Sequence, residues 1–460
     1  MTIELGTLHN GSTDLPLKLS PDGVSVPDAT LEEMNESAQR SAWDQIRQGI
    51  LAEKLGWDYF FLTEHHFQPE GIECSPNPMQ IQMAVAAHTS RIRLGQAANI
   101  LAWWHPIRIA EQAALLDVVS GGRLEFGVGR GYQPRETEVF GKPFGATIQD
   151  QERNRVFFDE AFEILLKAWT EPSFSHLGEF FSIPPRYTKW NHRQTKAYFK
   201  QPHVGRQLEQ VLDIGPDEPS FGGPTALAGS TTLREIQVFP RPIQKPYPQC
   251  WMPVQSERTV RWAASHGVNG VYIAAGKEEL KKNVDIYYDE AERSGWPDRL
   301  NRGSFQFGWD AESHRGMTTA AWMYITSPGK ERDQLARVDQ ALEFQYDHYS
   351  QFGLPLASGK DRITGQDVRD RGVCIAGPPD KIVEQILSIK EYVGYKDDFM
   401  FWTYFDFGGI GREELEEQLQ IFASDVMPSL RKECGGAPDL PLSPNQQLFD
   451  VEEATLAATA

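Results

Sequence analysis

The strongest constraint on the fold lies in residues 57–132, where short apolar segments alternate with longer segments of helical period. Strands are predicted at Tyr59–Leu62, Ile92–Leu101 and Leu124–Val128, and helices at Pro78–Thr89 and Ile107–Val118. Parallel strands need a long crossover connection, so this alternation predicts a parallel α/β sheet. Polar or small residues follow each strand. In a barrel of parallel strands, functional side chains gather at these carboxyl ends.

The alternation continues through most of the chain. Further strands are predicted at Ile3–Leu8, Trp251–Val254, Gly270–Ala274, Trp322–Thr326 and Phe399–Tyr404. Further helices are predicted at Ser37–Leu55, Asp150–Trp169, Ser256–His266, Glu278–Ser294, Pro379–Val393 and Glu413–Leu430. A chain of 460 residues could form two or three average domains, but one α/β barrel with insertions also fits this length.

Four segments interrupt this pattern. Residues 176–232 have no sustained period and are predicted to be an insertion that covers or frames the site. A separate domain there is the weaker alternative, because the segment lacks a strong core pattern. Residues 296–318 and 352–378 are candidate lid loops, and residues 436–460 form a Pro-rich, then acidic, tail outside the barrel.

Composition excludes several functions. The formal net charge is −19, which argues against nucleic acid as a partner because phosphate backbones are bound by clustered Lys and Arg. The four cysteines have no zinc-finger or CxxC spacing, so neither a metal site nor a disulfide framework is predicted. No apolar run is long enough to span a membrane, and no signal peptide is visible. We therefore expect a cytoplasmic protein.

Glu64-His65-His66 follow the second predicted strand. Neighbouring side chains on a strand point to opposite faces, so the two histidines cannot jointly bind one metal in regular strand geometry. An imidazole at this position can supply a proton or a hydrogen bond near neutral pH. The alternative is a structural histidine bonded to backbone, and from the residues alone that reading is the favoured one.

The run Gly127-Val128-Gly129-Arg130-Gly131 follows the fourth predicted strand. A dinucleotide fingerprint would need glycine at position 132, where a tyrosine stands, so that interpretation fails. Closely spaced glycines still let a backbone approach a flat ring, and the guanidinium of Arg130 is suited to phosphate. The alternative is a tight turn with Arg130 in an ordinary salt bridge.

Residues 253–259 join the fifth predicted strand to its helix. The exposed N–H groups of a helix N-terminus, together with the hydroxyls of Ser256 and Thr259, form a site suited to an anion. Ser256 can equally be the N-cap of the helix. The two interpretations are compatible, because a cap and a phosphate use the same donors.

The chain resembles the bacterial luciferase-like flavin-dependent monooxygenases. The resemblance is carried by TEHHF, TSRIRLG, HPIRIAEQAALLD, SGGRLEFGVGRGY and VFG, in that order and spacing. It implies a (β/α)8 TIM barrel over residues 1–435 with insertions at its C-terminal face. It also implies that His65 is the active-site histidine.

The resemblance further implies a set of residues around FMN. Arg130, Ser256 and Thr259 match positions at the phosphate, and Gly129 matches a position facing the ring. Asn99, after Ala98 on the third strand, is a candidate hydrogen-bond partner of the flavin edge, the alternative being a turn residue. Gln255 stands where the luciferase subunit has a glutamate, which leaves its role open. These candidate cofactor-binding residues are Ala98, Asn99, Gly129, Arg130, Gln255, Ser256 and Thr259.

The activity implied by the resemblance is oxygen insertion into a small apolar organic substrate, with molecular oxygen and reduced FMN. A separate flavin reductase would supply that FMN, because no nicotinamide motif is visible, and a homodimer is expected. One alternative is a hydride-transfer oxidoreductase that uses the deazaflavin cofactor of sister families. Another is a flavin-binding protein without catalysis, against which the presence of His65 argues.

Overall fold

The computed structural model describes residues 2–215, 226–227, 229–273, 276–294, 316–352, 363–395 and 398–438. The chain divides into two compact units. The first unit consists of Met1–Ile100, Leu116–Glu136 and Ile243–Ala460, and the second of Leu101–Leu115 and Thr137–Pro242. No helix within the described ranges is both long and apolar enough to cross a membrane.

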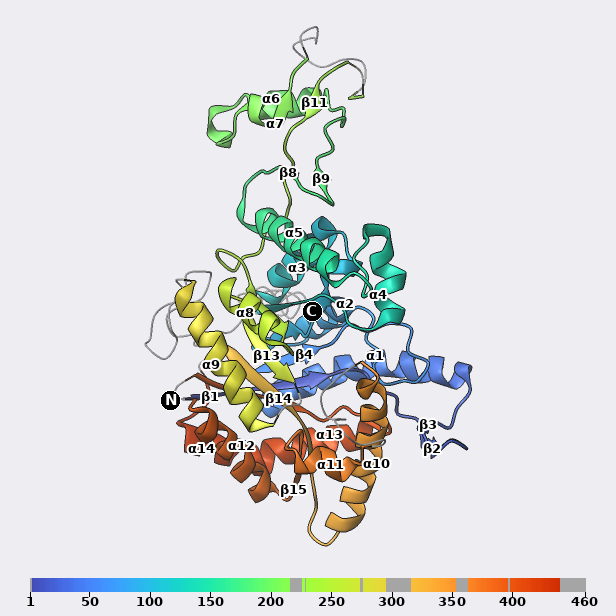
Figure 1. The fold of residues 1–460 in the computed structure, drawn as a ribbon. Helices are drawn as coiled ribbons and strands as arrows, with labels where there is room; N and C mark the ends of the chain where they lie inside the picture. Colours follow the sequence, from blue (N-terminus) through green and yellow to red (C-terminus); the bar gives the residue numbers. More distant parts are fainter. Residues whose placement is uncertain are drawn as a thin grey trace, which may run out of the picture. The chain divides into compact units, whose positions relative to one another are not determined.

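The first unit contains a closed barrel of eight parallel strands (Figure 1). In ring order these are β1 (Thr2–His9), β4 (Tyr59–Leu62), β5 (Arg93–Gln96), β7 (Leu124–Gly129), β12 (Gln249–Pro253), β13 (Asn269–Ile273), β14 (Met317–Ile325) and β16 (Asp398–Tyr404). The ring closes where β16 pairs with β1 and where β7 pairs with β12. The predicted TIM barrel is therefore confirmed.

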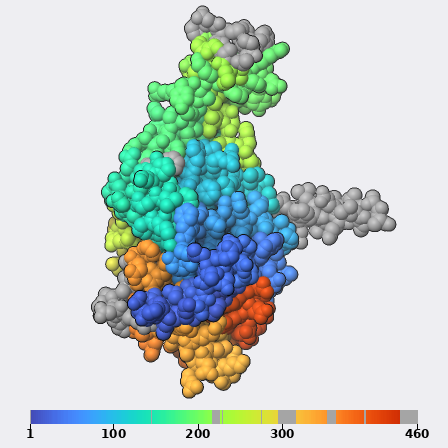
Figure 2. Space-filling model, turned by 90° about the vertical axis from the view of Figure 1, so that its right-hand side faces the viewer, coloured from blue at the N-terminus to red at the C-terminus, as the bar shows by residue number. Residues whose placement is uncertain are grey.

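Helices alternate with the barrel strands along the chain. They are α1 (Leu31–Leu55), α2 (Pro78–Ala86), α3 (Pro106–Ser120), α4 (Pro134–Gly141), α8 (Glu257–Ser265), α9 (Lys277–Arg293), α10 (Glu331–Ser350), α11 (Gly365–Asp370), α12 (Pro379–Val393), α13 (Arg412–Ile421) and α14 (Met427–Cys434). Neighbours in this layer include α1 with α13, so that the blue N-terminal part of the surface lies beside the red C-terminal helices (Figure 2).

Helix α1 begins six residues before the predicted start at Ser37. The reason is a capping box, in which the Thr30 hydroxyl accepts the Glu33 N–H at 3.3 Å and the Glu33 carboxylate accepts the Thr30 N–H at 2.7 Å. The helix ends at Gly56, whose φ of 90° lies in the left-handed region that glycine adopts without strain. This end agrees with the prediction.

Several regions differ from the sequence prediction. The predicted strand Ile92–Leu101 is divided into β5, the short β6 (Asn99–Ile100) and a 3-10 turn, with Ala97 and Ala98 between the two strands. Helix α10 was not predicted. Within the candidate lid loop 352–378, α11 and a strand, β15 (Cys374–Gly377), are formed, and β15 pairs with β14. Residues 353–362 of that loop and 296–315 of the other candidate lid lie outside the described residues.

Aromatic rings fill the interior of the barrel. Phe61 stacks on Trp402 with ring centroids 3.7 Å apart, and Trp251 lies 5.3 Å from Trp402. Glycines on adjacent strands make the space, since a Cβ on Gly6 would lie 2.6 Å from the Trp402 ring and one on Gly95 would lie 2.0 Å from the Phe61 ring. Close packing of this kind makes the barrel interior a core and leaves ligand space only at its ends.

The second unit contains α5 (Gln151–Thr170) and the whole of the predicted insertion 176–232. Its elements include α6 (Arg193–Phe199), α7 (Leu208–Val211), the hairpin β8 (His176–Leu177) with β9 (Ser182–Ile183), and the pair β10 (Leu212–Asp213) with β11 (Thr232–Leu233). It has a small apolar cluster of its own, formed by Phe199, Leu208, Val211 and Leu212. Whether the insertion frames the site remains a prediction.

Candidate functional site

A cavity of about 490 Å³ lies within the first unit, at the carboxyl ends of the barrel strands. This volume is in the range of small-molecule pockets. Its lining includes small residues, aromatic residues and residues with acidic or basic side chains. The small residues are Ala97, Ala98, Gly129 and Gly131, the aromatic residues include Tyr132, Trp322, Tyr349, Phe352 and Tyr404, and the acidic and basic residues are Glu64, His65, Glu73 and Arg130.

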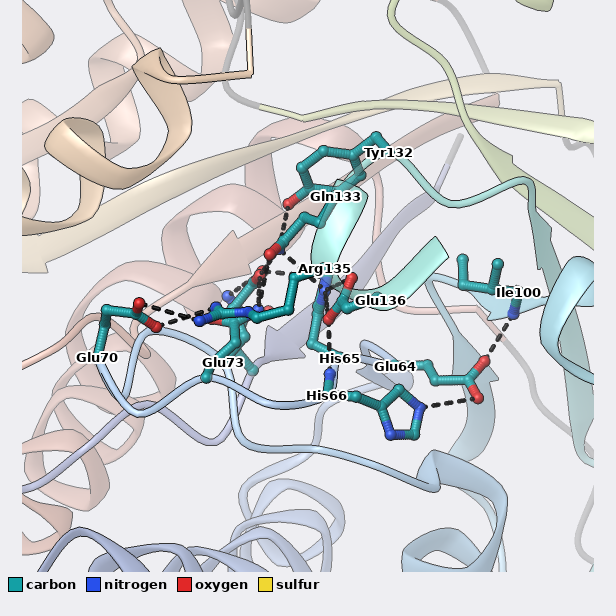
Figure 3. Close-up of polar contacts among 12 residues, drawn as sticks. Glu64, His65, His66, Glu70, Glu73, Ile100, Tyr132, Gln133, Arg135 and Glu136 are labelled. Atoms are coloured by element: carbon teal, nitrogen blue, oxygen red, sulfur yellow. Dashed lines mark hydrogen bonds and ion pairs between the residues drawn. The ribbon is translucent and has the colours of Figure 1, made fainter. Parts of the chain in front are cut away.

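His65 lies between two buried carboxylates (Figure 3). Its Nε2 is 3.2 Å from Glu73 Oε1, and its Nδ1 is 3.2 Å from Glu136 Oε1. Glu136 comes from α4 and also accepts the backbone N–H of His66 at 2.6 Å. The two ring nitrogens of His65 can therefore both donate, which is the geometry of an imidazolium.

The pKa of His65 reflects two opposing causes. Burial lowers the pKa of an imidazole, but the carboxylates of Glu73 and Glu136 raise it more, and the result is a pKa of about 9. The same pairing lowers the pKa of Glu136 although burial of that carboxyl acts to raise it. At neutral pH the site thus holds a protonated histidine within hydrogen-bond distance of both carboxyl groups.

Glu73 accepts hydrogen bonds from several neutral donors in addition to His65. Its Oε1 accepts from the Tyr349 hydroxyl at 2.6 Å and from Asn10 Nδ2 at 3.1 Å. Its Oε2 accepts from Gln133 Nε2 at 3.1 Å and Gln68 Nε2 at 3.2 Å. Hydrogen bonds to the ionised form stabilise a buried carboxylate, so this network holds the negative charge of Glu73 beside His65.

Glu64 and His66 make structural contacts. Glu64 Oε2 accepts the backbone N–H of Ile100 at 2.6 Å, which ties the loop after β4 to β6, and Glu64 Oε1 is 3.5 Å from His66 Nε2 (Figure 3). Only His65 of the three residues is placed between acids in the cavity wall.

Glycine is required at positions 127 and 129 for different structural reasons. A Cβ on Gly127 would lie 1.7 Å from the Gln96 carbonyl oxygen, so this residue lets β7 approach the end of β5. A Cβ on Gly129 would lie 2.7 Å from Ile100 Cδ1 and 3.4 Å from Ala98 Cβ. Gly129 therefore lets β6 lie close to β7, and Ala98, Gly129 and Ile100 together line this part of the cavity.

Asn99 differs from its neighbours. It is buried, and its Nδ2 donates to Gln96 Oε1 at 2.9 Å and to the Gly127 carbonyl at 3.0 Å. It does not line the cavity, whereas Ala98 and Ile100 on either side of it do. In the structure Asn99 joins the ends of β5 and β7.

The predicted anion-binding residues lie at the start of α8. Ser256 is the N-cap, and its Oγ accepts the Thr259 N–H at 3.3 Å and is 3.0 Å from the Thr259 hydroxyl. Arg130, Gln255 and Thr259 line the cavity. Residues at the N-terminus of α8 and Arg130 therefore line the same cavity, whereas Ser256 caps the helix and is not part of the lining.

Several residues of the site were not found from the sequence. Glu136 lies in α4 and Gln133 lies just before this helix, while Glu73 lies in a loop. No short sequence motif marks any of these three residues. Tyr349 lies on α10, whose buried residues Val338, Leu342, Gln345 and Tyr349 recur at helical spacing. That period could have revealed the helix, but not that it brings a hydroxyl to Glu73.

Three curated relatives show the sequence similarity. A sequence profile of the luciferase-like monooxygenases matches residues 26–205. Uncharacterized protein y4wF of Sinorhizobium fredii is 29% identical over 255 residues (55% of this chain, 56% of that protein), and y4vJ of the same organism is 37% identical over 142 residues (31% and 38%). This chain thus spans about half the length, or less, of these two relatives.

The oxygenase component of the flavin-dependent trigonelline monooxygenase of Acinetobacter baylyi is 22% identical over 407 residues, which cover 86% of this chain and 92% of that protein.

Two solved structures show the same fold. The oxygenating constituent of 3,6-diketocamphane monooxygenase from Pseudomonas putida, in complex with FMN, matches with a TM-score of 0.62 at 17% identity, over 94% of this chain and 99% of that one. An F420-dependent secondary alcohol dehydrogenase, in complex with an F420–acetone adduct, matches with a TM-score of 0.58 at 12% identity, over 94% and 100%. At these identities the likeness establishes the fold.

Proposed function

This chain belongs to the luciferase-like monooxygenases, as the match over residues 26–205 shows, and from that premise we propose that it is the oxygenase component of a two-component, FMN-dependent monooxygenase. Reduced FMN from a separate reductase and molecular oxygen would be used to oxygenate a small apolar organic substrate. The observation that carries the proposal is His65, protonated between two carboxylates in the wall of a cavity that also has a small-residue wall and a helix N-terminus.

The residues of the cavity fit a flavin. Ala97, Ala98 and Gly129 line the cavity with at most a methyl group each, which suits the approach of a flat tricyclic ring. Thr259 and Arg130 in the lining supply hydroxyl, backbone and guanidinium donors suited to a phosphate. A flavin bound here would supply the electrons that activate oxygen, chemistry for which the twenty side chains have no equivalent.

The residues of this chain would bind, orient and protonate. The aromatic residues of the lining exclude water from the reacting atoms. His65 holds a proton on Nε2, directed at the Glu73 carboxylate, which itself lines the cavity. Glu136 on the opposite ring nitrogen fixes the orientation of the imidazole. His65 is thus placed to act as a general acid or as a charged hydrogen-bond donor.

The decisive experiment is an anaerobic titration of the purified protein with reduced FMN and, in parallel, with the reduced deazaflavin cofactor. The FMN complex is then exposed to air with candidate substrates, and the products are analysed. Preferential binding of reduced FMN and an oxygenated product support the proposal. Preferential binding of deazaflavin with oxygen-independent turnover would replace it by hydride transfer, and FMN binding without any product would leave a flavin-binding protein.

Variants separate the two roles within the site. His65→Ala should lower turnover at least tenfold while FMN affinity stays within a few-fold, because the imidazole contacts Glu73 and Glu136 and is not among the predicted phosphate donors. Arg130→Ala and Ser256→Ala should instead weaken FMN binding.

Each of these two variants has a matched control. The side chain of Arg332 on α10 is 96% exposed, so Arg332→Ala is the control for Arg130→Ala. Thr30→Ala, which removes the cap of α1, is the control for Ser256→Ala. Unchanged FMN affinity in both site variants would place the phosphate elsewhere.

The proposal also includes a homodimer, as in the resembled family. Light scattering on the eluting protein would measure its mass directly.

A further inference from the structure

One residue of the loop after β4 has an unusual backbone conformation. Phe67 has a φ of 58°, and it is the one non-glycine residue with a positive φ among the described residues. This left-handed conformation is uncommon for a bulky residue, because the Cβ then lies too close to the backbone, and it persists only where the surroundings hold it. The side chain of Phe67 is 48% exposed, so burial of the ring in the core does not enforce the conformation.

Phe67 lies in a loop that carries two members of the site. The loop is closed by the backbone N–H of His65, which donates to the Ser75 carbonyl at 3.1 Å. His65 thus stands at one end of the loop, and Glu73 stands near the other end. The distance of 3.2 Å between His65 Nε2 and Glu73 Oε1 therefore depends on how the chain turns between these two residues.

The residues on either side of Phe67 contact different acids. Before it, the backbone N–H of His66 donates to Glu136 Oε1 at 2.6 Å (Figure 3). After it, Gln68 Nε2 donates to Glu73 Oε2 at 3.2 Å. These two carboxylates are the ones that contact the two ring nitrogens of the site histidine. The turn at Phe67 therefore lies between the contacts that the loop makes with both acids.

The sign of φ at Phe67 decides where the chain after it points. A change from 58° to about −65°, the value that proline imposes, would rotate the following chain by about 120° relative to the preceding chain. Because His66 is bonded to Glu136 on one side, such a rotation would move Gln68 away from Glu73 on the other side. The two hydrogen bonds thus stabilise the left-handed conformation, and that conformation keeps the loop in contact with both acids.

We propose that Phe67 is a positioning residue of the site, whose left-handed backbone holds the loop 65–75 in the shape that places His65 between Glu73 and Glu136. Phe67 is not among the residues that line the cavity, so it acts through the loop. The catalytic use of this placement rests on the proposed function, but the placement itself can be measured without flavin.

The first test compares two substitutions of Phe67 that both remove the ring. At a left-handed position glycine is unstrained whereas alanine is strained, so Phe67→Gly should have the higher urea midpoint of the two. At an ordinary φ the order would be reversed, because glycine gains more freedom in the unfolded chain. Both variants keep the hydrogen bonds at the two acids, so the pKa of His65 should stay within about half a unit of the wild-type value in each.

The second test forces the turn out of the left-handed region. Burial lowers the pKa of His65, but the carboxylates of Glu73 and Glu136, with a smaller contribution from Glu64, raise it to about 9, so this pKa reports where the ring lies. Phe67→Pro should lower the pKa by about one unit or more, because the loop can no longer hold the ring at both acids. Histidine-selective NMR titration of the flavin-free protein measures the change.

Gly329→Pro is the matched control for the proline. Gly329 lies before α10 with a φ of 77° and has open space around it, and it is at the opposite end of that helix from Tyr349. The control makes the same backbone change away from the cavity and should leave the pKa of His65 within about half a unit.

Three results would overturn the inference: a higher urea midpoint for Phe67→Ala than for Phe67→Gly, a changed pKa of His65 in those two variants, or equal pKa values in Phe67→Pro and Gly329→Pro. If Phe67→Pro does not fold, the alanine and glycine variants decide. Failure of reduced FMN to bind would instead overturn the proposed function and leave these measurements unaffected.

Discussion

Two buried histidines at the carboxyl ends of neighbouring barrel strands have opposite protonation. His9, the last residue of β1, is fully buried; its Nε2 is 2.9 Å from the Thr7 hydroxyl and its ring packs against Phe60. Burial lowers the pKa of His9 to about 3. His65, after β4, is 8% exposed, yet the carboxylates of Glu73 and Glu136 overcome burial and its pKa is about 9.

The comparison shows that burial alone does not decide the charge of a histidine; its polar neighbours do. It also separates two effects of pH on stability. The folded state prefers neutral His9. The contribution of His9 to the free energy of unfolding is therefore present above pH 6.5 and is lost as the pH falls toward about 3. The folded state prefers protonated His65. The contribution of His65 to the free energy of unfolding is therefore present below pH 6.5 and is lost as the pH rises through about 9.

The largest expected effect concerns His9. Between pH 7 and pH 4.5, titration of this residue in the unfolded chain should lower the free energy of unfolding by about 3 kcal/mol, at 1.36 kcal/mol per pH unit below 6.5. His9→Gln cannot titrate, so its urea midpoint should fall less over the same interval. Parallel curves for the two proteins would mean that His9 is not held neutral in the folded state.

The next effect tests the acids beside His65. Glu73→Gln removes one negative charge 3.2 Å from the ring and should lower the pKa of His65 by about one to three units. Histidine-selective NMR titration, with His65→Ala to assign the resonance, measures this shift. Glu70→Gln is the control, because that carboxylate pairs with Arg135 at 2.9 Å. A shift of equal size in both variants would contradict the local origin of the raised pKa.

The smallest effect is expected for Tyr349→Phe. This change removes the 2.6 Å hydrogen bond to Glu73 but leaves the carboxylate and its donors Asn10, Gln68 and Gln133. The pKa of His65 should therefore change by less than about half a unit, and upward, since Glu73 loses a competing donor. The same NMR titration measures it, and a fall of more than one unit would show that Glu73 depends on Tyr349 for its charge.

The barrel could be predicted from the sequence because strand and helix periods are local properties. Tyr59–Leu62 appears as predicted, and Leu124–Val128 is extended by one residue to Gly129. The third strand could not be placed as well, because the turn at Ala97–Ala98 depends on contacts with Gly127 and Glu64 rather than on its own residues. Helix α10 has a visible helical period in its buried residues, so this element too could be predicted from the sequence.

For the site, the sequence by itself determined which residues stand at the strand ends: His65, Gly129, Arg130 and the cap at Ser256. Only the tertiary structure decided the charge state of His65, because Glu73 and Glu136 reach it from other parts of the chain. Local spacing carries the propensity of a segment, whereas a pKa depends on distances in space between charges. The same reason separates His9 from His65, which no reading of their neighbours in the sequence would distinguish.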